Sequence, residues 1–243
     1  MGEIKVMKAI EQVEQLNHFI ENQDSLPHLF SIWKDAKLGK TCFSSSLGQE
    51  DQVLTDYIFR NSLAVDVFTL DTGRLFQETY DTLSSTVQKY KREIKCYFPN
   101  QQDVEELTVQ QGVNGFYDSV KKRKTCCSVR KILPLKRALA NQSVWITGLR
   151  REQSQNRSDC SIFEYDAQFE IIKFNPLLNW THKEITNYLD DHNVPQNKLH
   201  NKGYVSIGCA PCTRAVSPEE DHRAGRWWWE TSQKECGLHK SNN

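Results

Sequence analysis

Four of the eight cysteines in this 243-residue chain form two pairs whose spacing suits metal chemistry. Cys126 and Cys127 are adjacent, and Cys209 and Cys212 form a Cys-x-x-Cys pair far downstream. One zinc ion usually takes two Cys-x-x-Cys pairs, and adjacent cysteines chelate a single tetrahedral centre awkwardly. In an iron–sulfur cluster each iron takes its own thiolate, so neighbouring cysteines can serve neighbouring irons. The spacing therefore favours a cluster, with burial of Cys126 and Cys127 as small apolar side chains as the alternative.

The tandem cysteines lie in the most basic part of a chain that has no net charge. Residues 121–137 contain eight Lys or Arg and no Asp or Glu. Four thiolates on an iron–sulfur core would be an anionic assembly, and these cations would offset its charge while attracting an anionic substrate. Over the whole chain 31 basic residues balance 31 acidic ones, which argues against a general nucleic-acid or membrane-surface binder.

A serine- and glycine-rich turn is the second candidate site. The sequence TCFSSSLGQEDQ, residues 41–52, passes from an expected strand into an expected helix. The backbone N–H groups and hydroxyls of such a turn can surround an anion at the helix N-terminus, where the helix dipole also favours negative charge. A phosphate-like group would fit, although an ordinary polar turn has a similar composition. The turn lacks the Gly-Lys-Ser/Thr ending of a Walker A loop.

Cys236 is the candidate nucleophile. It lies near the chain end in polar company that includes Lys234 and His239. A thiol in such surroundings can be accessible, and nearby cations can keep it ionised. A lone polar cysteine is more often inert, so this thiol alone does not decide the chemistry.

Short apolar or β-branched runs alternate with helical windows after the first forty residues. This alternation indicates a mostly parallel sheet with right-handed crossovers, an α/β fold of Rossmann-like type. The expected strands are residues 40–44, 64–70, 92–98, 143–148 and 170–176. The expected helices are residues 3–21, 25–36, 49–60, 75–90 and 180–194, with a cap at Ser25 and a capping box of Thr181 and Glu184.

Composition bounds the class of protein. The length suits one sizeable α/β domain. No stretch approaches the ~20 apolar residues of a membrane span, and the N-terminus lacks the apolar core of a secretory signal, so we expect a soluble, cytoplasmic protein. The cysteines are too few and too unevenly spaced for a secreted disulfide framework. Cys42 and Cys96 have the pattern of buried strand residues, and Cys160 fits no motif.

Seven motifs in order give the chain a family resemblance. They are SSSLGQED, LDTGRLFQETY, TCCSVRKILPL, TGLRREQSQNR, GCAPCTRAV, GRWWWE and KECGLH. Together, over roughly residues 38–239, they resemble the assimilatory adenosine 5'-phosphosulfate (APS) reductases, members of the PAPS reductase family and the PP-loop superfamily. The related phosphoadenosine phosphosulfate (PAPS) reductases share the serine turn and ECGLH but generally lack both cysteine pairs. The resemblance therefore favours APS.

The resemblance also implies a chemistry for the cysteines. Cys236 would be the nucleophile, and a [4Fe-4S] cluster would be held by Cys126, Cys127, Cys209 and Cys212. In the implied reaction the Cys236 thiolate attacks the sulfur of APS, expels AMP and becomes an S-sulfocysteine. Thioredoxin, or a glutaredoxin-like donor, would then release sulfite by thiol exchange.

Three segments follow from the resemblance and the patterning. Residues 1–37 would form N-terminal helices, residues 38–220 the PP-loop reductase domain with its iron–sulfur site, and residues 221–243 a C-terminal catalytic tail. The three tryptophans at 227–229 follow two arginines and are expected to dock the tail onto the domain rather than stack on nucleic acid. The sequence leaves open whether the chain forms a homo-oligomer.

The substrate implied by the resemblance joins a sulfate to AMP, so positioning and charge neutralisation are the main tasks of its site. Lys131 lies five residues after Cys126, where it could face both cluster and sulfate, and Gly148 at a strand end would permit close approach of the nucleotide. For about half of the arginines a solvated basic face is the alternative. The candidate substrate-binding residues are Ser44, Ser45, Ser46, Gly48, Leu70, Gly73, Arg74, Lys131, Gly148, Arg150, Arg151, Arg157, Arg223, Arg226 and His239.

Other functions stay open at this point. A PAPS reductase or a reductase of dual specificity would share most of these motifs. A PP-loop ATP pyrophosphatase that thiolates tRNA is disfavoured by KECGLH and by the lack of a separate RNA-binding region. A non-enzymatic iron–sulfur redox sensor would not turn over APS.

Overall fold

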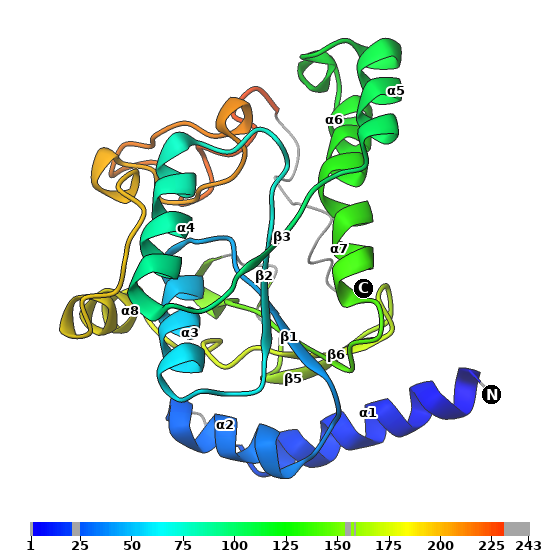
Figure 1. The fold of residues 1–243 in the computed structure, drawn as a ribbon, viewed down its shortest axis with the longest axis vertical. Helices are drawn as coiled ribbons and strands as arrows, with labels where there is room; N and C mark the ends of the chain where they lie inside the picture. The colour runs from blue at the N-terminus through cyan, green and yellow to red at the C-terminus, as the bar shows by residue number, and fades with distance from the viewer. Residues whose placement is uncertain (1, 21–24, 154–156, 158, 231–243) are drawn as a thin grey trace.

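A six-stranded sheet forms the centre of the computed structural model, which describes residues 2–20, 25–153, 157 and 159–230. The strand order is β3-β2-β1-β4-β6-β5 (Figure 1). Neighbouring strands are parallel except β5, which pairs antiparallel with β6 at one edge. The strands are β1 (Thr41–Ser44), β2 (Asp66–Leu70), β3 (Lys95–Tyr97), β4 (Val144–Ile146), β5 (Phe163–Asp166) and β6 (Ile171–Phe174).

The mostly parallel α/β fold expected from the sequence is confirmed. Each predicted strand contains an observed one, whereas β5 was not predicted. The predicted helices are found as α1 (Gly2–His18), α2 (Leu26–Asp35), α3 (Gln49–Arg60), α4 (Gln77–Tyr90) and α8 (His182–Asp191). The structure adds α5 (Gln101–Gln111), α6 (Val120–Cys127) and α7 (Leu133–Leu139). Among the described helices, none is both long enough and apolar enough to cross a membrane.

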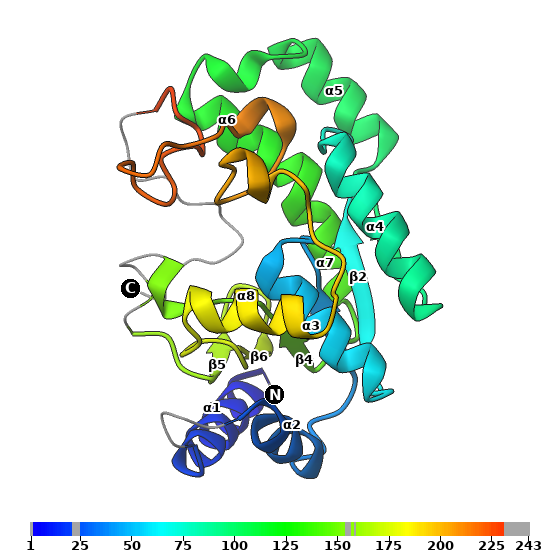
Figure 2. The same cartoon turned by 90° about the vertical axis from the view of Figure 1, so that its left-hand side faces the viewer.

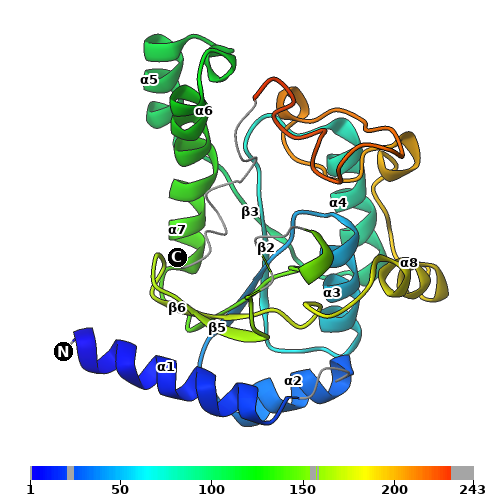
Figure 3. The same cartoon turned by 180° about the vertical axis from the view of Figure 1, so that it is seen from behind.

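Helices cover both faces of the sheet. On one face α3 contacts α4 and α8, and on the other α7 contacts β2 and β3 (Figures 1 and 3). Helices α5 and α6 rise beyond the sheet at the end where the orange and red segment near residues 205–230 also lies (Figure 2). Because β1 and β4 are neighbours whose crossovers run to opposite sides, a crevice is expected outside their carboxyl ends.

The two N-terminal helices pack onto the sheet as part of the main core. Phe30 of α2 meets Phe174 of β6 edge to face at 5.2 Å, and Phe174 stacks on Phe163 of β5 at 4.5 Å. The Ser25 cap is confirmed, since its hydroxyl accepts a hydrogen bond from the backbone N–H of His28 at 3.4 Å. Helices α1 and α2 are therefore joined to the sheet through apolar contacts.

A buried carboxylate holds the three helices α3, α4 and α8 together. Asp56 of α3 accepts hydrogen bonds from the hydroxyls of Tyr90 at 2.6 Å and Tyr188 at 2.8 Å. The start of α8 is held by the predicted capping box of Thr181 and Glu184, which is confirmed. These contacts hold α3 against α4 and α8, and so fix the direction in which its N-terminal end points toward the crevice.

Candidate active site

A cavity of about 270 Å³ lies at the carboxyl ends of the parallel strands. Its floor comes from the residues that follow β1, β2 and β4, which is where doubly wound sheets bind ligands. Many of the predicted substrate-binding residues meet here although they are far apart in sequence. Those that line the cavity are Ser44, Ser45, Ser46, Gly48, Leu70, Lys131, Gly148, Arg157, Arg223 and Arg226.

The serine turn presents the N-terminus of α3 to this cavity. Helix α3 begins after Gly48, which has no side chain to cap it, so the first N–H groups of the helix have no side-chain acceptor there. Leu47 has a φ of 62°, and this left-handed residue turns the chain from strand to helix. An uncapped helix N-terminus beside a cavity suits a phosphate group.

Asp51 occupies the inner side of the turn. Its Oδ2 accepts hydrogen bonds from the backbone N–H of Ser46 at 2.6 Å and from the Ser46 hydroxyl at 2.5 Å. Burial raises the pKa of Asp51 to about 6, although these two hydrogen bonds favour the ionised form. A Cβ atom on Gly148 would overlap the Asp51 carboxylate, so the glycine at the end of β4 lets α3 approach the strand.

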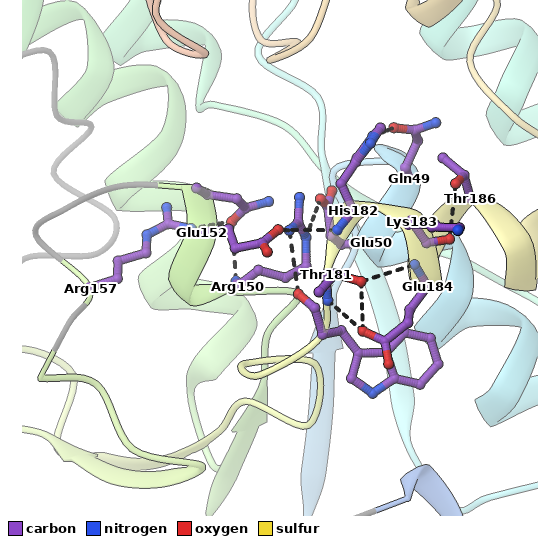
Figure 4. A network of polar contacts seen from close by, with 12 residues as sticks. Gln49, Glu50, Arg150, Glu152, Arg157, Thr181, His182, Lys183, Glu184 and Thr186 are labelled. Atoms are coloured by element: carbon purple, nitrogen blue, oxygen red, sulfur yellow. Dashed lines mark hydrogen bonds and ion pairs between the residues drawn. The ribbon is translucent and has the colours of Figure 1, made fainter. Parts of the chain in front are cut away.

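Arg150 faces carboxylates rather than the cavity (Figure 4). Its Nε lies 2.9 Å from Glu50 and its Nη1 lies 2.8 Å from Glu152, and the side chain is 1% exposed. Glu152 also accepts the backbone N–H of His182 at 3.1 Å, so this network joins the starts of α3 and α8. Arg150 thus contributes to the site indirectly, because its ion pair with Glu50 fixes the N-terminus of α3, which faces the cavity.

Three further predicted residues do not line the cavity, and they are Arg151, Gly73 and Arg74. Arg151 is exposed and donates to Asn179 at 3.3 Å. Gly73 and Arg74 follow β2 toward the second cysteine pair, where the Arg74 carbonyl accepts the backbone N–H of Ala210 at 2.8 Å. The Arg74 guanidinium lies 5.1 Å from the ring centre of Phe116. Arg74 therefore lies nearer the cysteines than the serine turn.

Two buried nitrogens without hydrogen-bond partners among the described residues border the cavity. They are Nε of Arg226 and Nε2 of His200. Burial lowers the pKa of His200 and also that of His222, which lies beside Arg223 in the cavity lining. A buried polar atom without a partner is costly unless a ligand or water satisfies it. These nitrogens are therefore suited to contact a bound anion.

The second cysteine pair and Cys126 share an apolar cluster. Cys209 and Cys212 are buried with Phe116 and Trp227, and Cys126 packs against them. None of the seven cysteines in the described ranges forms a disulfide. Burial raises the pKa of Cys212 to about 12, with a further contribution from the neighbouring Cys209 thiol. Cys126 and the Cys209–Cys212 pair thus lie together in the fold.

A π-helical turn follows directly after the tandem cysteines. Residues Ser128–Ile132 form this turn, η2, between α6 and α7. Such turns widen a helix and often occur at functional sites. Lys131 in this turn lines the cavity, and its charge offsets part of the rise that burial causes in the pKa of Cys126 and of Cys212. Lys131 therefore lies near both the cysteines and the cavity, and its role in binding stays a prediction.

Thiolates are the ligands that an iron–sulfur cluster takes, and both cysteine pairs supply them. Within the described part of the chain, no three His, Cys, Asp or Glu side chains are grouped to hold one metal ion. In a [4Fe-4S] cluster each iron takes one thiolate, so the four sulfurs surround a larger centre. Burial raises the pKa of Cys126, and the charges of Arg130, Arg74 and Lys131 offset part of that rise. Thiols from two segments around an apolar cluster, with cations beside them, are compatible with such a group.

Sequence reasoning missed several residues of the site. Asp51, Thr147, His200 and His222 line the cavity but are not among the predicted substrate-binding residues. Asp51 and Thr147 carried a local signal, because they lie within SSSLGQED and TGLRREQSQNR, whereas His200 and His222 lie in no motif. Cys236 and His239 lie outside the described residues, so their predicted roles stay predictions. Cys42 is buried in β1, while Cys96 of β3 and Cys160 are half-buried.

A mostly parallel α/β sheet with a serine-rich turn at its crevice defines a fold of the PP-loop type. Residues 40–215 match the family described as the phosphoadenosine phosphosulfate reductase domain. The chain is 50% identical over 202 residues to an adenosine 5'-phosphosulfate reductase of Agrobacterium fabrum, covering 83% of this chain and 78% of that one. The corresponding protein of Allochromatium vinosum is 50% identical over 205 residues, covering 84% and 80%. The chain belongs to the phosphoadenosine phosphosulfate reductase family.

Solved structures agree with this assignment. A phosphoadenylyl-sulfate reductase from Candida auris, in a phosphate complex, superposes with a TM-score of 0.70 and 25% identity, covering 84% of this chain and 96% of that chain. Yeast FAD synthetase, in complex with FAD, gives a TM-score of 0.50 at 15% identity, covering 86% and 75%. The second likeness concerns the fold alone.

Proposed function

We propose that this protein reduces APS to sulfite and AMP in sulfate assimilation, with electrons from a dithiol protein such as thioredoxin. One observation carries the proposal. The cavity behind the serine turn is bordered by Lys131, Arg223 and Arg226 and lies beside the cluster of cysteines. A phosphosulfate group needs this combination, because two linked anionic groups must be held next to a thiol.

The substrate would bind with its phosphate toward the serine turn and its sulfate toward the basic side chains. The uncapped N-terminus of α3 offers N–H donors for the phosphate. Lys131 and Arg226 border the cavity on the side of the cysteines and would neutralise the sulfate. Neutralisation also stabilises the negative charge that develops on AMP as the bond to sulfate breaks.

The chemical step belongs to Cys236. Its thiolate forms a bond to the sulfur of APS, the S–O bond to the AMP phosphate breaks, and AMP leaves with that electron pair. A donor thiolate then attacks the Cys236 sulfur and sulfite leaves, which gives a mixed disulfide that the second donor thiol resolves. The dithiol supplies both electrons and ends as a disulfide.

Cys126, Cys127, Cys209 and Cys212 would hold a [4Fe-4S] cluster. The group would supply a fixed, electron-rich centre beside the sulfate site. Thr72 already orients one of these sulfurs, since its hydroxyl lies 3.2 Å from Cys209 Sγ. The positive charges of Arg130 and Lys131 would stabilise both the anionic cluster and the anionic substrate.

The direct test is sulfite release by anaerobically purified protein with reduced thioredoxin. We expect sulfite from APS and much less from PAPS. Equal rates with both substrates would indicate a dual-specificity reductase. No sulfite from either, together with adenylation that consumes ATP, would instead support a PP-loop pyrophosphatase.

Replacing Lys131 with Ala is expected to lower kcat/KM for APS by about 10- to 150-fold, because a charge-assisted contact to the substrate contributes ~1.5–3 kcal/mol. Iron content should not change. The matched control is Lys136→Ala, which removes an exposed lysine from the same stretch of helix. An unchanged kcat/KM in Lys131→Ala would place this lysine outside the substrate site.

Binding of APS is expected to weaken by up to about tenfold between pH 5.5 and pH 7.5. The pKa of Asp51 is about 6, and a bound anion beside it should raise that pKa further. Protonated Asp51 therefore favours binding below pH 6, and this gain is lost as the pH rises through 6 and above.

Titration calorimetry on a Cys236→Ser background, which prevents turnover, would measure this dependence. Asp51→Asn should make the affinity for APS less dependent on pH, because the contribution of Asp51 is removed. The dependence that is left would come from groups such as His200 and His222, whose pKa values burial lowers. The same slope in both proteins would assign the pH dependence to other groups.

A further inference from the structure

A buried ion pair joins the helix of the tandem cysteines to the last described residue of the chain. Arg123 Nε lies 2.5 Å from Glu230 Oε1, and Arg123 Nη2 lies 2.9 Å from Glu230 Oε2. The two side chains are 2% and 4% exposed. A bidentate pair in such surroundings fixes the geometry of both partners, because either charge left alone would be buried without compensation.

Two guanidinium groups lie close to the ring of Trp227. The Arg123 guanidinium is 4.3 Å from its ring centre and the Arg226 guanidinium is 4.8 Å. The backbone N–H of Trp227 donates to the carbonyl of Cys212 at 3.2 Å, and that of Glu230 donates to the carbonyl of Trp227 at 2.9 Å. Residues 226–230 are thus held against both cysteine segments.

Arg123 also contacts the tandem cysteines themselves, since its side chain makes a hydrogen bond with Cys127. One guanidinium therefore faces a proposed cluster ligand and the carboxylate of Glu230. Through Arg226, which shares Trp227 with it, the same arrangement borders the substrate cavity. Cys127, Glu230 and the cavity are thus connected through Arg123, Trp227 and Arg226.

We propose that Arg123 and Glu230 form an anchor that positions Cys236 for its reaction with the substrate. This inference rests on the proposed function. Five residues lie between Glu230 and Cys236, and the six residue steps from Glu230 to Cys236 span at most ~20 Å. The location of Glu230 therefore limits where the thiol can reach, and fixing it raises the effective concentration of the thiol at the sulfate. Arg123 and Glu230 act as positioning residues.

The test measures S-sulfonation of Cys236 in a single turnover, with saturating APS and no thioredoxin, by mass spectrometry at timed intervals. Glu230→Gln removes the charge and keeps the shape. We expect its iron content and its affinity for APS to match the parent within about twofold, and its sulfonation rate to fall at least about tenfold. Glu230→Asp, which keeps the charge, should recover part of the rate.

The matched control breaks an exposed ion pair at the start of the same helix. Lys122 and Asp118 lie 2.7 Å apart with exposed fractions of 40% and 57%, so Asp118→Asn should leave the sulfonation rate unchanged. A second chain keeps the anchor but carries four inserted Gly and Ser residues directly after Glu230. It should also sulfonate more slowly, because the distance from the anchor to Cys236 is longer.

A Glu230→Gln rate within twofold of the parent would overturn the inference. A normal rate in the insertion chain, combined with iron loss in Glu230→Gln, would overturn it too, since the pair would then serve only to hold the cysteine site. Failure of the proposed function has a different signature, which is no sulfonation of the parent protein by APS.

Discussion

Cys236→Ser protein is expected to release no measurable sulfite from APS, a loss of more than about a thousandfold in rate. A serine hydroxyl at neutral pH is a far weaker nucleophile than a thiolate, and an enzyme that loses its nucleophile retains only binding and electrostatic catalysis. The variant should keep its iron and still bind APS, because Cys236 belongs to neither cysteine pair. Iron analysis and calorimetry would measure these two properties.

The parent protein given APS without thioredoxin should carry one added sulfonate, about 80 Da, on the peptide that contains Cys236. Reduced thioredoxin should then discharge it as sulfite. Cys160→Ser is the matched control, since Cys160 is half-buried against the main core and far in sequence from both pairs, and it should form the adduct normally. A sulfonate on Cys42, Cys96 or Cys160, or iron loss in Cys236→Ser, would refute the assignment.

Anaerobically purified protein is expected to contain about four irons and four acid-labile sulfides per chain. Cys127→Ser should lose most of this iron, its brown colour and its activity, because one iron would lack its thiolate. Iron and sulfide assays with visible absorption spectra would measure the loss. Cys96→Ser is the control, because Cys96 lies half-buried in β3 and belongs to neither cysteine pair.

Stoichiometric zinc without sulfide would contradict the cluster. So would full iron in Cys127→Ser, which would show that the tandem cysteines do not both act as ligands. Neither result would bear on Cys236, so the ligand and nucleophile predictions are independent of each other.

Much of the fold could be predicted because local patterns carry it. Runs such as residues 64–70 and 143–148 are apolar enough to read as buried strands, and the capping box at Thr181 is a signal contained within four residues. Helix α5 was missed because its sequence is mostly polar, and Leu107 is its one buried residue. Strand β5, FEYD, is too short to show a period and depends on pairing with β6.

In the site, too, local motifs could be predicted, whereas contacts between distant residues could not. Residue types and spacing indicated the serine turn and both cysteine pairs, because each is a short motif whose chemistry follows from its own residues. Adjacent arginines show the limit of that reasoning. Arg150 is enclosed by Glu50 and Glu152, whereas Arg151 is exposed, and nothing in the local sequence separates them.

The sequence by itself determined the kind of sheet and indicated the serine turn and the two cysteine pairs, since these depend on neighbours within a few residues. Only the tertiary structure decided which charges meet. The pairing of Arg123 with Glu230 joins residues 107 apart, and the cavity gathers His200 and Arg226 with the serine turn. Burial then sets the pKa of Asp51 near 6, because the desolvation of a carboxylate depends on everything packed around it.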